Sequence, residues 1–242
     1  AGTANQDVPQ DHAFTAALYQ HAQKAGIKYV ISGSNFATES ILPAEWGYSA
    51  MDAIQLRAIH KRYGLKAIGD FPILNFLDLY VRYPLFRKVN VLRPLNYLSY
   101  NKEKAITILE ENYGWRYYGG KHYESRWTRF FQAYYLPYRF GYDKRKAHLS
   151  SLILSKQLSR SDAMVELQKP LYDEKLLEAD KVFIAKKLQI SLTQLNELIE
   201  QPAHHFSEYP NHQRRLRMKV WAFRNIRAAL NFSRKVLRRA DR

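Results

Sequence analysis

The stretch YGWRYYGGKHYESRWTRFFQAYYLPYRFGYDKRKAH, residues 113–148, has the most unusual composition in the chain and decides the predicted fold and site. Residues 113–142 alone contain thirteen of the thirty-four aromatic residues, five Arg or Lys, and a single acid, Glu124. An ordinary core segment rarely carries so many charges, because each buried charge needs a partner. Aromatic faces can pack on sugars or bases, and fixed cations bind phosphate or carboxylate. The block therefore predicts a pocket for an anionic ligand that contains rings.

Two features within the block place candidate site residues. The pair Gly119-Gly120 permits backbone shapes that bring Lys121 and His122 close to a ligand. From Ser125 the pattern is helical to about residue 136, with Ser125 and Arg129 on neighbouring rows.

A second helix begins after Asp143, which suits an N-cap. Lys144 and Arg145 in its first turn form either a charged rim on the pocket or a solvated first turn. Both interpretations remain open from the residues alone.

The segment upstream of the block alternates helices and short strands. A helix is expected from Asp11 to residue 25, with Phe14, Leu18 and Ala22 facing inward. The β-branched run at 27–32 then predicts a strand, and the run at 89–100 predicts another, broken at Pro94. This order favours an α/β fold with a parallel sheet.

The polar loop after the first strand, G-S-N-F-A-T-E at 33–39, is the next candidate site. Ligands of open parallel sheets collect beyond the carboxyl ends of the strands, where Asn35, Thr38 and Glu39 would lie. The alternative is a simple capping loop at the start of a helix. Lys102, which heads an expected helix at 102–112 capped by Asn101, is a candidate phosphate contact or a surface lysine.

The remaining elements are expected to be helical. A helix at 50–63 should turn Met51 and Ile54 inward, and Asp52 either supports its first turn, which we favour, or faces the site. The apolar run at 71–86 should pack in the core, the alternative being that it lies on a partner or membrane surface. Beyond residue 148, helices are expected at 159–167, at 173–188 with an apolar stripe of Leu176, Leu177, Ala179 and Phe183, and at 191–199.

The net charge of +16 is concentrated at the carboxyl end, where residues 211–242 hold eleven Lys or Arg against one acid. Such a tail is suited to bind nucleic acid, an anionic lipid surface or an acidic partner. The alternative is a solvated helix face whose apolar stripe docks on protein.

Zero cysteines exclude disulfides and thiol catalysis, and no Cys/His cluster offers a zinc site. No apolar run reaches the length of a membrane span and no signal peptide is recognisable, so a cytoplasmic protein is expected.

Residues 114–132, G-W-x-Y-Y-G-G-K-H-Y-E-S-x-W-T-R-F-F-Q, and 136–153, L-P-x-R-F-G-Y-D-K-R-K-A-H-L-S-S-L-I, resemble a family hallmark. They are similar to the N-acetyl sugar amidotransferases (WbpG/PseA type) of bacterial surface-polysaccharide synthesis, within the PP-loop ATP pyrophosphatase superfamily. The resemblance extends from about residue 2 to residue 209. The S-G-G-x-D-S phosphate loop of that superfamily is not in this sequence, so we expect the chain to correspond to the carboxyl portion of a longer enzyme.

The resemblance implies an enzyme that uses ATP and Mg²⁺ to convert the acetamido group of a nucleotide-linked sugar to acetamidino, in lipopolysaccharide O-antigen synthesis. It implies a HisH-like glutaminase that supplies ammonia and a HisF-like partner that channels it. The implied site residues divide into a catalytic set, Lys121, His122 and Glu124, a substrate-binding set, Arg129, Lys144 and Arg145, and a cofactor-binding set, Asn35, Thr38 and Lys102. The loop at 33–39 is also similar to the G-T-x-N-x-x-E loop of NAD synthetases, which makes Glu39 a ligand of magnesium through pyrophosphate.

The expected fold class is α/β, the distal part of a PP-loop (adenine nucleotide alpha-hydrolase-like) parallel sheet followed by a mainly helical C-terminal region. Three parts are expected: a partial PP-loop domain at 1–112, an aromatic and basic substrate region with helices at 113–210, and a basic helix at 211–242. Two other functions stay open, a PP-loop tRNA-modifying enzyme and a non-enzymatic module whose aromatics stack nucleic-acid bases.

Overall fold

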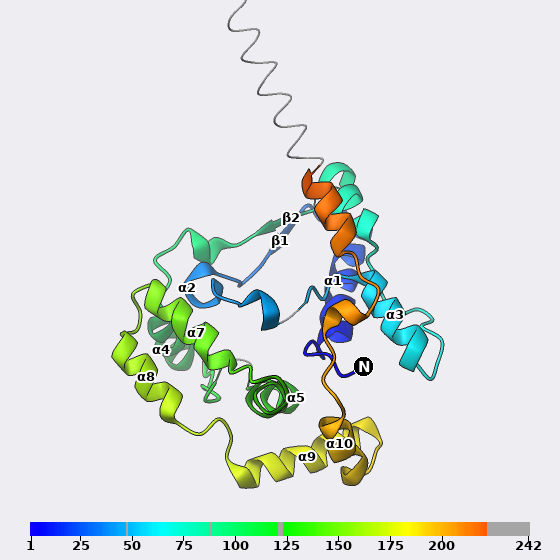
Figure 1. Cartoon of the computed structure of the whole chain (residues 1–242). Helices are drawn as coiled ribbons and strands as arrows, with labels where there is room; N and C mark the ends of the chain where they lie inside the picture. Colours follow the sequence, from blue (N-terminus) through cyan, green and yellow to red (C-terminus); the bar gives the residue numbers. More distant parts are fainter. Residues whose placement is uncertain (47, 88, 121–122, 222–242) are drawn as a thin grey trace, which may run out of the picture.

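The computed structural model describes residues 1–46, 48–87, 89–120 and 123–221, which form a mostly helical fold with a small parallel sheet (Figure 1). Helices α4, α7 and α8 lie together on one side of the molecule, α1 and α3 lie on the other, and α9 and α10 lie below (Figure 1). The predicted site residues Lys121 and His122, and most of the basic tail, lie outside the described residues.

The sheet pairs two segments that are about sixty residues apart in sequence. Strand β1 (Tyr29–Ile31) runs parallel to β2 (Asn90–Leu92), with Val30 opposite Val91. The ladder continues past β1, because the Ser32 N–H donates to the Leu92 carbonyl at 2.8 Å. The predicted parallel pairing and the mainly helical C-terminal region are therefore confirmed, whereas a full PP-loop sheet stays a prediction.

Helix α1 (Val8–Lys24) begins earlier than predicted and buries a different face. Asp11 lies inside its first turn rather than at the cap, and Phe14, expected inside, is 65% exposed. The buried residues include His12, whose Nδ1 lies 2.8 Å from the Ala50 carbonyl and whose Nε2 accepts from the Leu74 N–H at 3.0 Å. This face points inward because His12 forms hydrogen bonds with two buried backbone groups. The pattern of apolar residues gives no sign of these bonds.

Helix α3 (Ala53–Tyr63) and the π-helix η2 (Asp78–Arg87) lie near α1. Helix α3 begins three residues later than predicted, so Asp52 is its N-cap rather than a residue of its first turn, and Asp52 Oδ1 accepts from the N–H groups of Ile54 and Gln55. Residues from α1, from the segment before η2 and from η2 itself form a small apolar core: Ala16, Leu74 and Tyr83.

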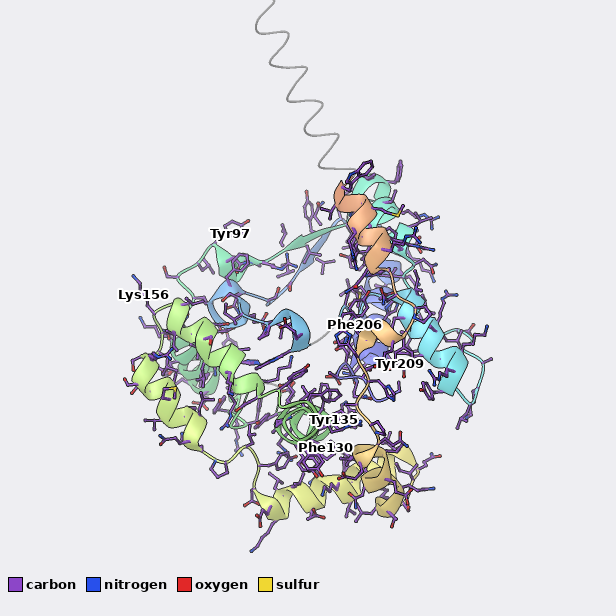
Figure 2. The ribbon with its side chains drawn as sticks, in the orientation of Figure 1. Tyr97, Phe130, Tyr135, Lys156, Phe206 and Tyr209 are labelled. Atoms are coloured by element: carbon purple, nitrogen blue, oxygen red, sulfur yellow. The ribbon has the colours of Figure 1, made fainter. Side chains whose placement is uncertain are left out.

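The main core lies around one continuous helical rod. Helix α5 (Arg126–Phe130), the π-turn η4 (Phe131–Tyr135) and α6 (Leu136–Phe140) follow one another without a break. Figure 2 labels Phe130 and Tyr135 on this rod, which packs against α9 (Glu174–Leu188) and α10 (Leu192–Glu200). Half of the aromatic block is thus core, because burial of large rings stabilises the packing of α5, α9 and α10.

The N-caps predicted at Asn101 and Asp143 are confirmed, and the helices expected from 159, 173 and 191 also begin at a capping residue. A side-chain oxygen at each N-cap accepts a backbone N–H in the first turn, as it does at α4 (Lys102–Tyr113), α7 (Lys144–Leu154) and α8 (Arg160–Gln168). The N-caps of α4, α7, α8, α9 and α10 are Asn101, Asp143, Ser159, Asp173 and Ser191. Short turns complete the fold: α2 (Phe36–Glu39), η1 (Ala44–Trp46), η3 (Pro94–Asn96) and η5 (Phe206–Glu208).

Candidate functional site

A connected group of cavities lies between α2, α4, α7, α8 and the segment from Trp115 to Tyr123. The largest, the main cavity, has a volume of about 790 Å³ and includes Lys102, Lys144 and Arg145 in its wall. A second cavity of about 300 Å³ is lined by residues that include Asn35, Thr38, Glu39 and Lys102. A third, of about 200 Å³, has Glu39 and Lys144 in its wall. Residues predicted from three distant parts of the sequence therefore meet at one hollow.

The loop after β1 is held by hydrogen bonds to the segment after β2. The Phe36 N–H donates to Asn96 Oδ1 at 2.9 Å, and Arg93 Nε donates to Ser34 Oγ at 2.9 Å. Asn35 is buried and caps α2, its Oδ1 accepting from the Thr38 N–H at 3.0 Å and from Thr38 Oγ1 at 3.1 Å. The capping interpretation is thus correct for Asn35, and the cap also fixes the turn that carries Thr38 and Glu39 to the second cavity.

Helix α7 packs on α2, and residues of both helices line the third cavity. The buried Ser151 Oγ accepts from the Ile41 N–H at 3.1 Å, and Ser155 Oγ donates to the Ala37 carbonyl at 3.0 Å. These two bonds bring Glu39 of α2 and Lys144 of α7 to the wall of the same cavity.

Lys102 is placed by a side chain from the turn that follows α7. Its backbone N–H donates to Gln157 Oε1 at 2.8 Å, and Gln157 Nε2 donates to the Tyr100 carbonyl at 3.1 Å. The Lys102 Nζ lies 5.7 Å from the centroid of the Tyr117 ring, a cation–π contact. Lys102 lines both the main and the second cavity, so it lies where they meet.

The double glycine passes close to an aromatic ring. A Cβ at Gly120 would lie 2.6 Å from the Tyr123 ring, which no real side chain tolerates without a shift. Gly119 has a φ of +84°, a conformation that L residues rarely adopt. Both glycines line the main cavity, and they lead directly to the predicted residues Lys121 and His122.

The walls contain tyrosines whose pKa values are raised. Burial raises the pKa of Tyr117, with a further contribution from Glu166, and burial also raises the pKa of Tyr123. Burial raises the pKa of Tyr118 as well, and the neighbouring carboxylate of Glu124 adds to the effect. Glu124 therefore lies beside Tyr118, which lines the second cavity. The three tyrosine hydroxyls keep their protons and can donate hydrogen bonds.

Two of the predicted substrate-binding arginines make strong internal contacts. Arg145 pairs with Asp143 at 2.9 Å and donates to the Lys169 carbonyl at 2.7 Å, while still lining the main cavity. Arg129 pairs with the fully buried Asp180 at 2.6 Å and lies 3.3 Å from the Tyr172 hydroxyl. Arg129 thus lies at the α5–α9 contact, and its role toward substrate stays a prediction.

His148 is a wall residue that the sequence interpretation did not select. It contributes to all three cavities and lies on α7, four residues after Lys144. That i, i+4 spacing places both side chains on one face of the helix, a signal that could have identified it.

Residues 124–226 match the family described as LPS biosynthesis protein WbpG-like, C-terminal domain. This region is WbpG-like. It contains the α5 rod, the first turn of α7 and His148, and the match confirms the resemblance that the aromatic and basic block indicated. No curated protein and no solved structure matches the chain.

The ranges 1–46, 48–87, 89–120 and 123–221 contain neither a metal-binding cluster nor a membrane-spanning helix. Within those ranges, no group of three or more His, Cys, Asp or Glu side chains is arranged to hold a metal ion. No helix within them is both long and apolar enough to cross a bilayer.

Proposed function

We propose that the chain forms the sugar-nucleotide side of an ATP-dependent amidotransferase that converts an acetamido group to acetamidino during lipopolysaccharide synthesis. The observation that carries the proposal is the meeting of two regions at one hollow. The WbpG-like region supplies Lys144, Arg145 and His148, and the upstream segments supply Lys102 and the Asn35–Glu39 loop.

The size and chemistry of the hollow suit this class of substrate. A volume of about 790 Å³ falls in the range of pockets for small ligands. Lys102, Lys144 and Arg145 provide positive charge for a diphosphate. Tyr117 and Tyr118 stack with ring centroids 6.0 Å apart and interplanar angle 25°, which gives flat faces for a base or a sugar ring.

The proposed reaction has two steps. The oxygen of the acetamido carbonyl attacks the α-phosphorus of ATP, a P–O bond forms, and pyrophosphate leaves. Ammonia then adds to the activated carbon, and the C–O bond breaks to release AMP and leave an acetamidino group. Cations of the cavity wall stabilise negative charge that develops on phosphate oxygens. The ammonia would come from a HisH-like glutaminase through a HisF-like partner.

The residues present fit a magnesium ion that is shared with phosphates. Mg²⁺ commonly binds one or two carboxylates together with substrate phosphates, and Glu39 lies at the second and third cavities beside Asn35 and Thr38. When bound there, magnesium would neutralise the pyrophosphate leaving group.

The first test measures binding of a UDP-linked diacetamido uronic acid by isothermal titration. Lys144→Ala should weaken binding about tenfold or more, because a charge-assisted hydrogen bond is lost. Lys146→Ala is the matched control, since Lys146 is an exposed lysine in the same first turn of α7. Equal affinity of the two variants would contradict the proposed position of the substrate.

The second test measures the reaction in the complete enzyme with an ammonium salt as nitrogen donor. Mass spectrometry would detect replacement of the carbonyl oxygen by an imino group. Glu39→Gln should lower turnover more than it lowers sugar-nucleotide affinity, because Glu39 is assigned to the pyrophosphate. Unchanged turnover would remove that assignment.

A further inference from the structure

The start of the carboxyl-terminal helix presents an outward face that combines cations with large apolar side chains. Residues 213–221 are helical, and Arg214, Arg217, Met218 and Trp221 share one side at i, i+3, i+4 and i+7 spacing. All four are exposed, and Trp221 is 70% exposed. An amphipathic surface helix would normally turn such apolar residues toward the protein.

The opposite side of this helix is the one that docks on the protein. His212 is fully buried, with its ring 5.7 Å from that of Phe76 and 5.9 Å from that of Tyr80. Lys219 Nζ lies 4.5 Å from the centroid of the Tyr80 ring. The sequence predicted docking through an apolar stripe that includes Leu216 and Val220, but Val220 is 65% exposed. The side that docks carries His212 and Lys219 instead, and Met218 and Trp221 face outward.

The neighbouring π-helix η2 adds to the exposed apolar surface. Figure 1 shows the helix at 213–221 beside η2, and Leu77, Leu85 and Phe86 of this neighbouring segment are all more than half exposed. The acid Asp78 in η2 is paired with Arg82 at 2.6 Å, which offsets its negative charge. We define the docking face as the outward side of residues 213–221 together with Leu77, Leu85 and Phe86.

The charge of this part of the chain identifies the partner. Residues 211–240 contain ten Lys or Arg and no Asp or Glu. We propose that the docking face binds the surface of an anionic lipid bilayer, with Trp221 and Phe86 entering the headgroup region and the arginines contacting lipid phosphates. Helices that lie in the plane of a membrane surface combine Lys and Arg with Trp, Phe and Leu in this way.

A nucleic acid would explain the cations but not the aliphatic side chains. Phosphate contacts need Lys or Arg and base stacking needs aromatic rings, whereas exposed Leu77, Leu85 and Met218 gain nothing from either. Burial of these side chains at the acyl boundary of a bilayer removes them from water.

The test is co-sedimentation of the 242-residue chain with vesicles of phosphatidylcholine, with and without phosphatidylglycerol. Binding is expected only with phosphatidylglycerol, and salt should weaken it because it screens exposed charges. Arg214→Gln combined with Arg217→Gln should reduce binding roughly 30-fold, since each cation near an anionic membrane contributes about 1 kcal/mol. Met218→Gln combined with Trp221→Gln should reduce it about tenfold or more.

Matched controls remove the same groups elsewhere on the surface. Lys175→Gln combined with Lys186→Gln removes two exposed cations from α9, and Leu65→Gln removes a fully exposed apolar side chain. Both controls should bind vesicles much as the unchanged chain does. Loss of binding in the controls equal to that in the docking-face variants would overturn the proposal. Absence of binding to phosphatidylglycerol would also overturn it, as would salt-sensitive binding to single-stranded RNA alone.

Discussion

At the scale of single residues, the buried acid Asp180 explains why the predicted buried stripe of α9 is wrong at Ala179, although Leu177 and Phe183 pack on the main core as predicted. Ala179 was expected inside and is exposed, while Asp180 is fully buried. Arg129 at 2.6 Å and Arg126 at 3.3 Å neutralise it, and the Tyr172 hydroxyl donates to it at 2.5 Å. Burial and this hydrogen bond raise the pKa of Tyr172. An acid inside a core cannot be predicted without its partners, because alone it would be strongly unfavourable.

Replacing Asp180 should destabilise the contact between α5 and α9. Asp180→Ala removes one partner of a buried ion pair and leaves Arg129 without its acceptor, so the free energy of unfolding should fall by about 3 kcal/mol or more. Urea unfolding followed by circular dichroism measures it. Glu178→Gln on the same helix changes an exposed carboxylate that pairs with Lys181 and is screened by water, so it should cost less than about 1 kcal/mol. Similar losses in the two variants would contradict this account.

A second buried pair, Asp52 and His212, joins the start of α3 to the carboxyl-terminal helix. Asp52 Oδ2 accepts from the Tyr48 hydroxyl at 2.6 Å and from the His212 N–H at 2.7 Å. Burial lowers the pKa of His212 from its ordinary value of 6.5, against the opposing influence of Asp52 and with a smaller contribution from Arg215. His212 therefore folds as the neutral imidazole.

The lowered pKa of His212 predicts a loss of stability in acid. Below its ordinary pKa of 6.5 the unfolded chain binds a proton that the folded chain does not, so stability is complete above this pH and falls as the pH decreases. The slope for one proton is at most about 1.4 kcal/mol per pH unit. Urea midpoints between about pH 5 and pH 8 should show a smaller decrease in His212→Phe than in the unchanged chain. His21→Gln, a change at an exposed histidine of α1, should keep the full decrease.

At the scale of elements, helix starts were predictable and buried faces were less so. Asn101 and Asp143 cap their helices as predicted, and Ser159, Asp173 and Ser191 cap the helices expected from those positions, because a cap is a local interaction within one turn. The predicted inward face of α1 did not include His12. This residue is held by the backbone groups of Ala50 and Leu74, which lie far from it in sequence.

The segment around Gly120 supports an element-scale prediction. Gly120→Ala would place a methyl group 2.6 Å from the Tyr123 ring, so the ring must move and the unfolding free energy should fall by about 1 kcal/mol or more. The affinity for the sugar nucleotide should fall as well, because both residues line the main cavity. Gly33→Ala is the control for the unfolding free energy, since a Cβ there meets no atom within 4 Å. Thermal unfolding and titration calorimetry would measure both effects, and an unaffected Gly120→Ala variant would contradict the crowding.

At the scale of the whole molecule, the candidate site depends on how α7 docks on α2. The site residues occur at 35–39, at 102 and at 144–148, and no local pattern links them. Ser151 and Ser155 tie α7 to the α2 segment, and Gln157 ties the turn after α7 to the start of α4. These polar contacts hold together the segments that line the hollow.

Breaking one of these ties should affect stability and binding together. Ser151→Ala leaves the Ile41 N–H without its acceptor in a buried position, which should cost about 1–3 kcal/mol. Because Glu39 and Lys144 would no longer be held together, the affinity for the sugar nucleotide should also fall. Ser150→Ala, one residue earlier on α7, should change neither quantity appreciably. A Ser151→Ala variant with normal stability and affinity would show that this bond does not hold the site.

The sequence by itself determined the parallel strand pair, the helix starts and the WbpG-like character of the aromatic and basic block. These features depend on local periodicity, caps and composition, which are written in consecutive residues. Only the tertiary structure decided that Arg129 pairs with Asp180, that His12 is buried, and that His148 joins the cavity wall. The physical reason is that a charged or polar side chain becomes stable inside a protein only through partners from distant segments, and the chain fold alone brings those partners together.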